Sequence, residues 1–182
     1  ETLRVHKNTC LIHKEELIRK RIIEKRPDQP ISLVVTKKQD HHLDWPFFKQ
    51  PINRWIVSSK ENFEELHPPK GYDRLVELKP TWAETFTELT KSGLTKIVIL
   101  GGAKLVGSLL IEDQVDELQL TLTPKLLGGF YSWTPHKINN LPIKFSEDNA
   151  WIIKEIKKME DNEIMLRYFK KESKLSLKEK DK

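Results

Sequence analysis

The chain has 182 residues, of which 37% are hydrophobic and 32% charged, and this composition predicts one globular domain that can bury its own core. A single cysteine excludes an internal disulfide, and no Cys, His and acidic cluster has metal-ligand spacing, so no metal is expected. The apolar runs are shorter than the roughly 20 residues that span a bilayer, and the N-terminus lacks the layout of a secretory signal. We therefore expect a cytoplasmic protein without membrane contact.

The net charge of +5 is spread along the chain rather than gathered in one stripe. Part of it lies in the lysine-rich tail 171–182, which is typical of a disordered segment, so the folded domain is expected to span residues 1–170. No RNP-type strand, zinc-finger spacing or helix-turn-helix pattern accompanies the basic residues, which argues against nucleic acid as a partner. A small anionic ligand suits this charge better.

Helix and strand patterns alternate along the first hundred residues. An apolar stripe among charged residues predicts an amphipathic helix over 14–25. A second helix is predicted over 81–93, opened by Thr81 and closed by Gly93. Short apolar runs predict strands at 31–36, 54–58, 73–78 and 96–100.

The rest of the chain begins with apolar residues at helical spacing from Leu105 to about Asp113, followed by a period-two strand pattern over 116–124. Two further runs, at 150–160 and 162–171, predict an antiparallel hairpin. Strands that alternate with helices imply right-handed crossovers between parallel strands. We therefore predict an α/β fold with a mainly parallel sheet, flanked by helices and finished by a C-terminal antiparallel hairpin.

Two adjacent glycines, Gly101 and Gly102, stand between the predicted strand 96–100 and the helix that follows it. Without a Cβ atom they would let the backbone approach a pyrophosphate closely, and the first N–H groups of the helix would stabilise its charge. The full GxGxxG pattern is absent, and a bare Gly-Gly pair at such a junction is more often a simple tight turn. The residues alone leave both interpretations open.

The run "KIVILGGAKLVGSLLIEDQVDELQLTLTPKLLGG" at 96–129 resembles part of the reductase domain at the C-terminus of bacterial bifunctional riboflavin-biosynthesis deaminase/reductase proteins. The matching features follow in order: an apolar strand, Gly-Gly-Ala, a helix with paired leucines, Val-Asp-Glu-Leu, an alternating strand, and Pro before Leu-Leu-Gly-Gly. "ETLR" at 1–4, "ISLVVT" at 31–36 and "LDWPFF" at 43–48 extend the resemblance, which covers residues 1 to about 170. It is particularly close to standalone forms of that domain, and the family has a dihydrofolate reductase-like fold.

The resemblance implies an enzyme that uses NADPH to reduce the ribosyl group of 5-amino-6-(5-phosphoribosylamino)uracil to a ribityl chain. Its substrate would be this phosphorylated pyrimidine, its cofactor would supply the hydride, and the protein would position the two. No residue is carried over as catalytic. The resemblance also implies a homodimer formed through the region of "TPKLLGGF" at 123–130.

Matched residue by residue, the resemblance assigns cofactor contacts to two threonines and to the glycine segment. Thr2 would contact the cofactor, and Thr36, at the end of its strand, would meet the adenosine end. Lys37 and Lys38 would attract the 2′-phosphate of NADPH by their charge and position, although they also fit a solvated loop. Backbone N–H groups would wrap the pyrophosphate from Gly101, Gly102, Ala103, Lys104, Leu105 and Val106.

Three positions expected near the substrate depart from the family pattern. His6 falls where the family places a residue near the substrate, yet a lone histidine is also consistent with an exposed structural residue. Cys10 follows nearby, and without a base partner it is not expected to act as a nucleophile. Leu100 stands where many members carry an acidic residue that contacts the substrate, and leucine cannot accept that hydrogen bond.

The family's first strand, with a Ser-x-Asp-Gly stretch, would precede residue 1. The chain is therefore expected either to be a fragment or mis-started version of the domain, or to have lost catalysis. Two alternatives to the leading prediction stay open. One is a reductase of the same fold that acts on another substrate, such as a pterin, and the other is a nucleotide-binding relative without turnover.

Two groups of aromatic side chains have ordinary structural interpretations. Trp45, Phe47 and Phe48 are expected to be core residues or subunit-interface anchors. His41 and His42 have no further ligands at suitable spacing, which favours a polar turn over a metal site.

Overall fold

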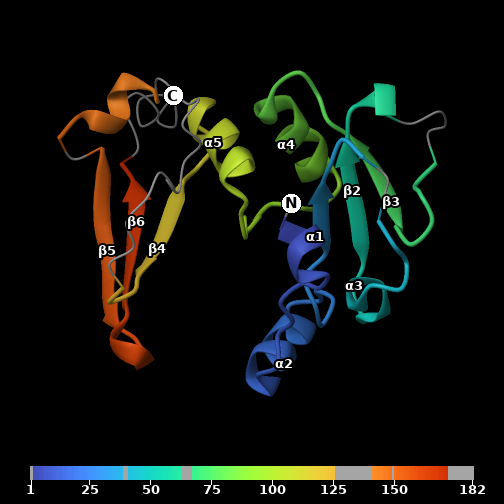
Figure 1. The fold of residues 1–182 in the computed structure, drawn as a ribbon, viewed down its shortest axis with the longest axis horizontal. Coiled ribbons are helices and arrows are strands. Elements are labelled where there is room, and N and C mark those ends of the chain that lie inside the picture. Colours follow the sequence, from blue (N-terminus) through green and yellow to red (C-terminus); the bar gives the residue numbers. More distant parts are fainter. Residues whose placement is uncertain (1, 39–40, 63–66, 126–140, 149, 172–182) are drawn as a thin grey trace. The chain divides into compact units, whose positions relative to one another are not determined.

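The computed structural model describes residues 2–38, 41–62, 67–125, 141–148 and 150–171. The chain divides into two compact units, Glu1–Gly102 and Ala103–Lys182, and each is described by itself. Figure 1 draws the elements of both units. Within the described ranges, no helix is long and apolar enough to cross a membrane. The predicted tail lies outside the described residues from position 172 onward, so its disorder stays a prediction.

The first unit contains a parallel sheet of three strands in the order β1-β2-β3, side by side in Figure 1. The strands are β1 (Ser32–Val35), β2 (Arg54–Ser58) and β3 (Arg74–Glu77). They confirm three of the four strands predicted in this part of the chain. Four of the five residues of β2 are buried, because this strand is central and both of its faces are covered.

Two hydrophobic clusters lie on the two faces of β2. Ile56 belongs to one cluster, and its neighbours Trp55 and Val57 belong to the other, since successive side chains of a strand point to opposite faces. Trp45 and Phe47 are buried in the first cluster, which confirms their prediction as core residues. Each buried side chain of this size contributes about 1.5–3 kcal/mol through the hydrophobic effect.

The helices of the first unit are α1 (Thr2–His6), α2 (Glu15–Ile23), α3 (Pro46–Lys49) and α4 (Trp82–Lys91), with a 3-10 turn at Lys60–Asn62. Thr81 begins α4 with a reciprocal cap: its hydroxyl accepts a hydrogen bond from the Glu84 N–H at 3.2 Å. The Glu84 carboxylate in turn accepts a hydrogen bond from the Thr81 N–H at 3.4 Å. This cap confirms the predicted helix start.

Helix α2 confirms the helix predicted over 14–25, but it contributes no buried residue to the unit. The side chains of its apolar stripe lie largely in solvent, with Ile22 58% and Ile23 80% exposed. The helix therefore has an amphipathic pattern, but its apolar stripe does not pack on a hydrophobic core in this structure.

The prediction of a strand over 96–100 is wrong. These residues form neither a helix nor a strand, and Val98 is 82% and Leu100 62% exposed. A β-branched composition favours extended backbone, but a strand also needs a neighbour for its N–H and C=O groups. None of the described strands pairs with this segment.

The second unit contains helix α5 (Ala103–Ile111) and an antiparallel sheet in the order β4-β6-β5. The strands are β4 (Glu117–Leu122), β5 (Trp151–Lys158) and β6 (Ile164–Lys170), with 3-10 turns at Ile143–Ser146 and Glu160–Asn162. Strands β5 and β6 confirm the predicted hairpin, and β4 confirms the strand predicted over 116–124. Asp161 and Asn162 make the hairpin turn with left-handed backbone, at φ values of 59° and 61°.

The register of this sheet places the ion pairs of Arg167 on one face, together with Met165 and Phe169, and most of the aliphatic side chains on the other. One face, here called the polar face, carries Arg167 between Glu117 of β4 and Glu155 of β5. The guanidinium donates hydrogen bonds to these two carboxylates at 2.6 and 2.8 Å. The opposite face, here called the apolar face, carries Leu118, Leu120, Leu122, Ile153, Ile156, Ile164, Leu166 and Tyr168.

Candidate functional site

Thr2 lies against the two glycines in the first unit. A Cβ atom built on Gly102 would lie 3.5 Å from the Thr2 Oγ1 atom, and one built on Gly101 would lie 3.8 Å from it. Apart from the glycines' own chain neighbours, no other described atom comes within 4 Å of either position. The structure thus brings together three predicted cofactor residues that are about a hundred positions apart in sequence. We call this group the glycine corner.

The glycine corner has room for a group that approaches the main chain. Gly101 has a φ of +108°, a conformation that favours glycine, whereas Gly102 is not in the left-handed region. Neither glycine donates a main-chain hydrogen bond to a described residue, so both N–H groups are available as donors. Backbone donors beside a hydroxyl, without side chains above them, fit the phosphate oxygens of a dinucleotide.

The next four predicted cofactor residues form the first turn of α5 and belong to the second unit. Ala103 and Lys104 are exposed, while Leu105 and Val106 are half-buried. The first N–H groups of any helix have no partner within it, which makes them suitable donors to an anion. The contact of these four residues with a cofactor stays a prediction.

A second group of predicted residues lies where the parallel strands end. Thr36 follows β1, and its N–H donates a hydrogen bond to the Val57 carbonyl of β2 at 3.1 Å. The Thr36 hydroxyl also bonds both the N–H and the carbonyl of Lys38, at 3.1 and 2.9 Å, which fixes the turn that carries Lys37. In open parallel sheets, ligands bind outside the carboxyl ends of the strands. We call this edge the strand-end edge.

Further polar residues, which were not among the predicted site residues, follow β2 at the same edge. Ser58 ends β2 and is 1% exposed, and Ser59 and Lys60 come directly after it. The signal was present in "RWIVSSK", because residues that follow neighbouring parallel strands meet at one edge. The strand-end edge therefore consists of Thr36, Lys37, Lys38, Ser58, Ser59 and Lys60.

The charge of this edge comes mainly from lysines on its surface. Lys37, Lys38 and Lys60 are exposed. Lys79, which follows β3, donates a hydrogen bond to the Glu77 carboxylate at 2.6 Å, and this bond holds the pKa of Glu77 below its usual range. Lys79 is thereby paired, and the charge of Lys60 also acts on the Glu77 carboxylate, so the positive potential at this edge rests chiefly on Lys37 and Lys38.

The residues expected near the substrate lie on the surface of the first unit. His6 ends helix α1, and both it and Cys10 are exposed. Leu100 is 62% exposed and directly precedes the glycine corner. No described contact joins these side chains into a catalytic set, and the catalytic residue remains unassigned.

The two adjacent histidines differ in their surroundings, and only His42 fits the predicted polar turn. His42 is exposed, but His41 is half-buried, and its Nδ1 atom lies 2.8 Å from the Tyr72 hydroxyl. Burial raises the pKa of the Tyr72 phenol well above its usual value, and the charges of Arg4 and Arg54 oppose this rise only in part. No group of three or more His, Cys, Asp and Glu side chains that could hold a metal occurs in the part of the chain that the structure describes.

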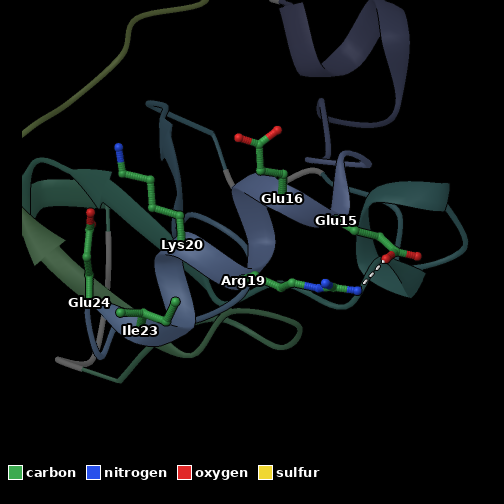
Figure 2. A pocket seen from close by; sticks show the side chains of 6 residues that line it. All are labelled: Glu15, Glu16, Arg19, Lys20, Ile23 and Glu24. Atoms are coloured by element: carbon green, nitrogen blue, oxygen red, sulfur yellow. Dashed lines mark hydrogen bonds and ion pairs between the residues drawn. The ribbon is translucent and has the colours of Figure 1, made fainter.

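An open hollow of about 640 Å³ lies along α2, away from both groups of predicted residues. Figure 2 shows that one helix supplies its lining side chains and that Arg19 reaches back to Glu15, at 3.0 Å. Glu16 and Lys20 point to another side of the helix. Because these side chains do not converge, the hollow is a solvated helix face rather than a ligand site.

Two solved structures show that the fold is of the dihydrofolate reductase-like α/β class. A pyrimidine reductase-like protein of Corynebacterium diphtheriae has a similar structure, with a TM-score of 0.64 and 15% identity over 94% of this chain and 73% of that one. RibD of Acinetobacter baumannii is similar with a TM-score of 0.65 and 16% identity. That match covers 93% of this chain but 45% of the Acinetobacter protein, so the chain spans less than half of its length.

The family follows from the sequence match. The model of the RibD C-terminal domain matches residues 5–151, and the chain belongs to this family. The match confirms the resemblance found in the sequence, and the similar structures confirm the predicted fold class. No curated protein matches the chain.

Proposed function

We propose that this chain is an NADPH-dependent reductase of riboflavin biosynthesis that reduces the ribosyl group of 5-amino-6-(5-phosphoribosylamino)uracil to a ribityl chain. Membership of the RibD C-terminal domain family supports the pathway and the reaction type. The observation that carries the cofactor assignment is the position of the Thr2 hydroxyl over Gly101 and Gly102.

The residues of the chain would bind and orient the cofactor. At the glycine corner, the Thr2 hydroxyl and the two glycine N–H groups would hold pyrophosphate oxygens. The resemblance assigns the same cofactor to Ala103, Lys104, Leu105 and Val106, whose N–H groups begin α5. When bound, NADPH supplies the hydride. The protein contributes position and electrostatics, which is consistent with the lack of an assigned acid or base.

The strand-end edge would select NADPH over NADH. Lys37, Lys38 and Lys60 are exposed cations that follow β1 and β2, and ammonium groups suit a phosphate group. NADPH differs from NADH by one 2′-phosphate, so these lysines would stabilise only the phosphorylated cofactor.

A calorimetric titration with both cofactors tests this assignment. We expect NADPH to bind more tightly than NADH, and Lys37→Gln to weaken NADPH binding about threefold to tenfold while NADH binding stays the same. Lys20→Gln is the matched control, because Lys20 is an exposed lysine of α2. A chain that binds neither cofactor would contradict the proposal.

The glycine corner is tested by Gly102→Ala. The new methyl group would make ordinary contact with Thr2 at 3.5 Å, so we expect the fold to be kept and thermal unfolding to change little. The methyl would occupy the approach to the backbone, and NADPH affinity should fall about tenfold or more. Unchanged affinity would refute the glycine corner as a phosphate site.

The substrate is the second part of the proposal. Leu100 is exposed and apolar where the resemblance expects an acidic contact to the substrate, an observation that favours a nucleotide-binding relative without turnover as the alternative. NADPH oxidation with the ribosylaminopyrimidine, compared with a dihydropterin, distinguishes the three cases. Turnover of the pyrimidine supports the proposal, turnover of the pterin identifies another reductase, and binding without turnover supports the alternative.

We also propose that the protein is a cytoplasmic homodimer. The region 123–130 named for this role lies mostly outside the described residues. The apolar face of the second unit supports association, because Ile153 and Ile156 on it are 53% and 64% exposed. Sedimentation should give a dimer that Ile156→Glu converts to a monomer, whereas Lys157→Glu on the other face should leave it unchanged.

A further inference from the structure

The segment between α1 and α2 has no regular structure, yet two glutamine side chains hold it in place. The Gln50 amide accepts a hydrogen bond from the Thr9 N–H at 3.0 Å and donates one to the Thr9 carbonyl at 2.8 Å. The Gln29 amide does the same with Ile12, at 2.9 Å in both directions. Each amide thus gives one residue of the segment the two main-chain bonds that a neighbouring strand would supply.

The main chain of Gln50 is itself attached to a rigid part of the unit. Its main-chain N–H bonds the Pro46 carbonyl at 3.1 Å, and its carbonyl accepts a bond from the Ile52 N–H at 2.9 Å. The Arg54 guanidinium donates a further bond to the same carbonyl and another to the Phe47 carbonyl. The main chain of Gln50 is therefore fixed beside the buried Phe47 and Ile52, independently of the bonds that its side chain makes with Thr9.

The Gln29 amide is fixed by burial. The residue is only 8% exposed, and its N–H bonds the Asp28 carboxylate at 2.9 Å. A buried amide needs partners for both its N–H and its C=O group, and here the main chain of Ile12 satisfies both. Neither partner could be removed without leaving a buried polar group unpaired.

The held segment continues directly from helix α1, which carries Thr2. The Lys7 carbonyl accepts a bond from the Phe47 N–H at 2.9 Å, and Leu3 and Leu11 pack on the first hydrophobic cluster. These contacts and the two amides anchor the chain on both sides of His6. These anchored residues adjoin α1, the helix that carries the Thr2 hydroxyl of the glycine corner.

We infer that Gln50 and Gln29 are positioning residues of the cofactor site, which keep Thr2 against Gly101 and Gly102 by holding Thr9 and Ile12. The inference rests on the proposed function, because it assigns the held helix to cofactor binding. A neutral amide is required in this role: a carboxylate cannot donate to a carbonyl, and an apolar side chain can neither donate nor accept.

Cys10 provides a direct measure of the held segment. It is exposed, it lies between Thr9 and Ile12, and it is the single cysteine of the chain, so a nitroxide label attaches there alone. We expect Gln50→Met and Gln29→Met to increase the mobility of the label in the electron paramagnetic resonance spectrum. Gln119→Met, at an exposed position of β4, is the matched control and should leave the spectrum unchanged.

The Gln50→Glu variant gives a pH signature that a general loss of packing would not produce. Its carboxylate cannot donate to the Thr9 carbonyl, but the protonated acid can. The carbonyl and partial burial raise the pKa of the new carboxyl, whereas the Thr9 N–H and the nearby Arg54 guanidinium lower it. Label mobility should be high and NADPH affinity about threefold to tenfold below that of the wild type at pH 8. Both differences from the wild type should diminish as the pH is lowered and the new carboxyl becomes protonated. Gln50→Met should show no such recovery.

The outcomes separate this inference from the proposed function. An unchanged Cys10 spectrum in Gln50→Met overturns the anchoring, and a mobile label with unchanged NADPH affinity in the unlabelled variant overturns the positioning role. A wild-type chain that binds no NADPH overturns the proposed function and the positioning role with it, while the spectra still decide whether the amides hold the segment. Circular dichroism of each variant confirms that it is folded.

Discussion

Ile56 of β2 and Ile156 of β5 are the same kind of residue in the two sheets, yet Ile56 is fully buried and Ile156 is 64% exposed. The parallel sheet has a hydrophobic cluster on each face of its central strand. The antiparallel sheet has one polar face, crossed by the ion pairs of Arg167, and one apolar face with several half-exposed side chains. The first sheet is therefore stabilised by burial and the second relies more on cross-strand pairs, which suits the first to hold a precise site and the second to form an interface.

The largest effect is expected from truncating the two isoleucines. Ile56→Ala should lower the free energy of unfolding by about 2–5 kcal/mol, because it leaves a cavity at a fully buried position. Ile156→Ala should lower it by less than about 1 kcal/mol, since most of that side chain is already in water. Urea unfolding of both variants measures the difference, and equal losses would contradict the contrast between the sheets.

A smaller effect is expected where a hydroxyl joins α4 to the parallel sheet. Thr85 is fully buried, and its hydroxyl accepts a bond from the Lys79 N–H and donates one to the Thr81 carbonyl, both at 3.0 Å. Thr85→Val keeps the shape but leaves the Lys79 N–H without this partner, which should cost about 1–3 kcal/mol. Thr87→Val, at an exposed position of the same helix, should change stability by less than about 0.5 kcal/mol in the same urea experiment.

The buried phenol of Tyr72 adds a dependence on alkaline pH. Because its pKa is raised in the folded chain, its contribution to stability is present below the ordinary tyrosine pKa of about 10 and is lost as the pH rises beyond it. Tyr72→Phe removes the bond to His41 and should cost about 1 kcal/mol at pH 8. The difference in the free energy of unfolding between the wild type and Tyr72→Phe should be smaller at pH 10.5 than at pH 8. A difference that stays constant would show that the phenol does not cause the dependence on pH.

The smallest effect is expected on the polar face of the second sheet. Arg167→Met removes bonds to Glu117 and Glu155 that join all three strands, so the urea midpoint should fall slightly. The loss should diminish in added salt, because these groups are partly exposed and salt screens them. A loss that is as large as that of Ile56→Ala, or independent of salt, would mean that the pairs are stronger than their exposure suggests.

The local elements of this protein could be predicted from the sequence with few errors. Thr81, with Glu84 three residues later, predicts the start of α4, and the period-two pattern over 116–124 predicts β4. The glycine pair and the residues around it carried the family resemblance that the match over residues 5–151 confirms. These features depend on local chemistry and on the spacing of side chains, both of which can be read directly from the chain.

Only the tertiary structure decided which elements are paired and covered. The run 96–100 is as apolar as β2, but β2 has strands on both sides, whereas the run pairs with none of the described strands and Val98 is 82% exposed. The approach of the Thr2 hydroxyl to Gly101 and Gly102, and the bonds of Gln50 and Gln29 to Thr9 and Ile12, bring together residues that are distant in sequence. No local pattern specifies such contacts, because they depend on how separate elements pack rather than on the preferences of neighbouring residues.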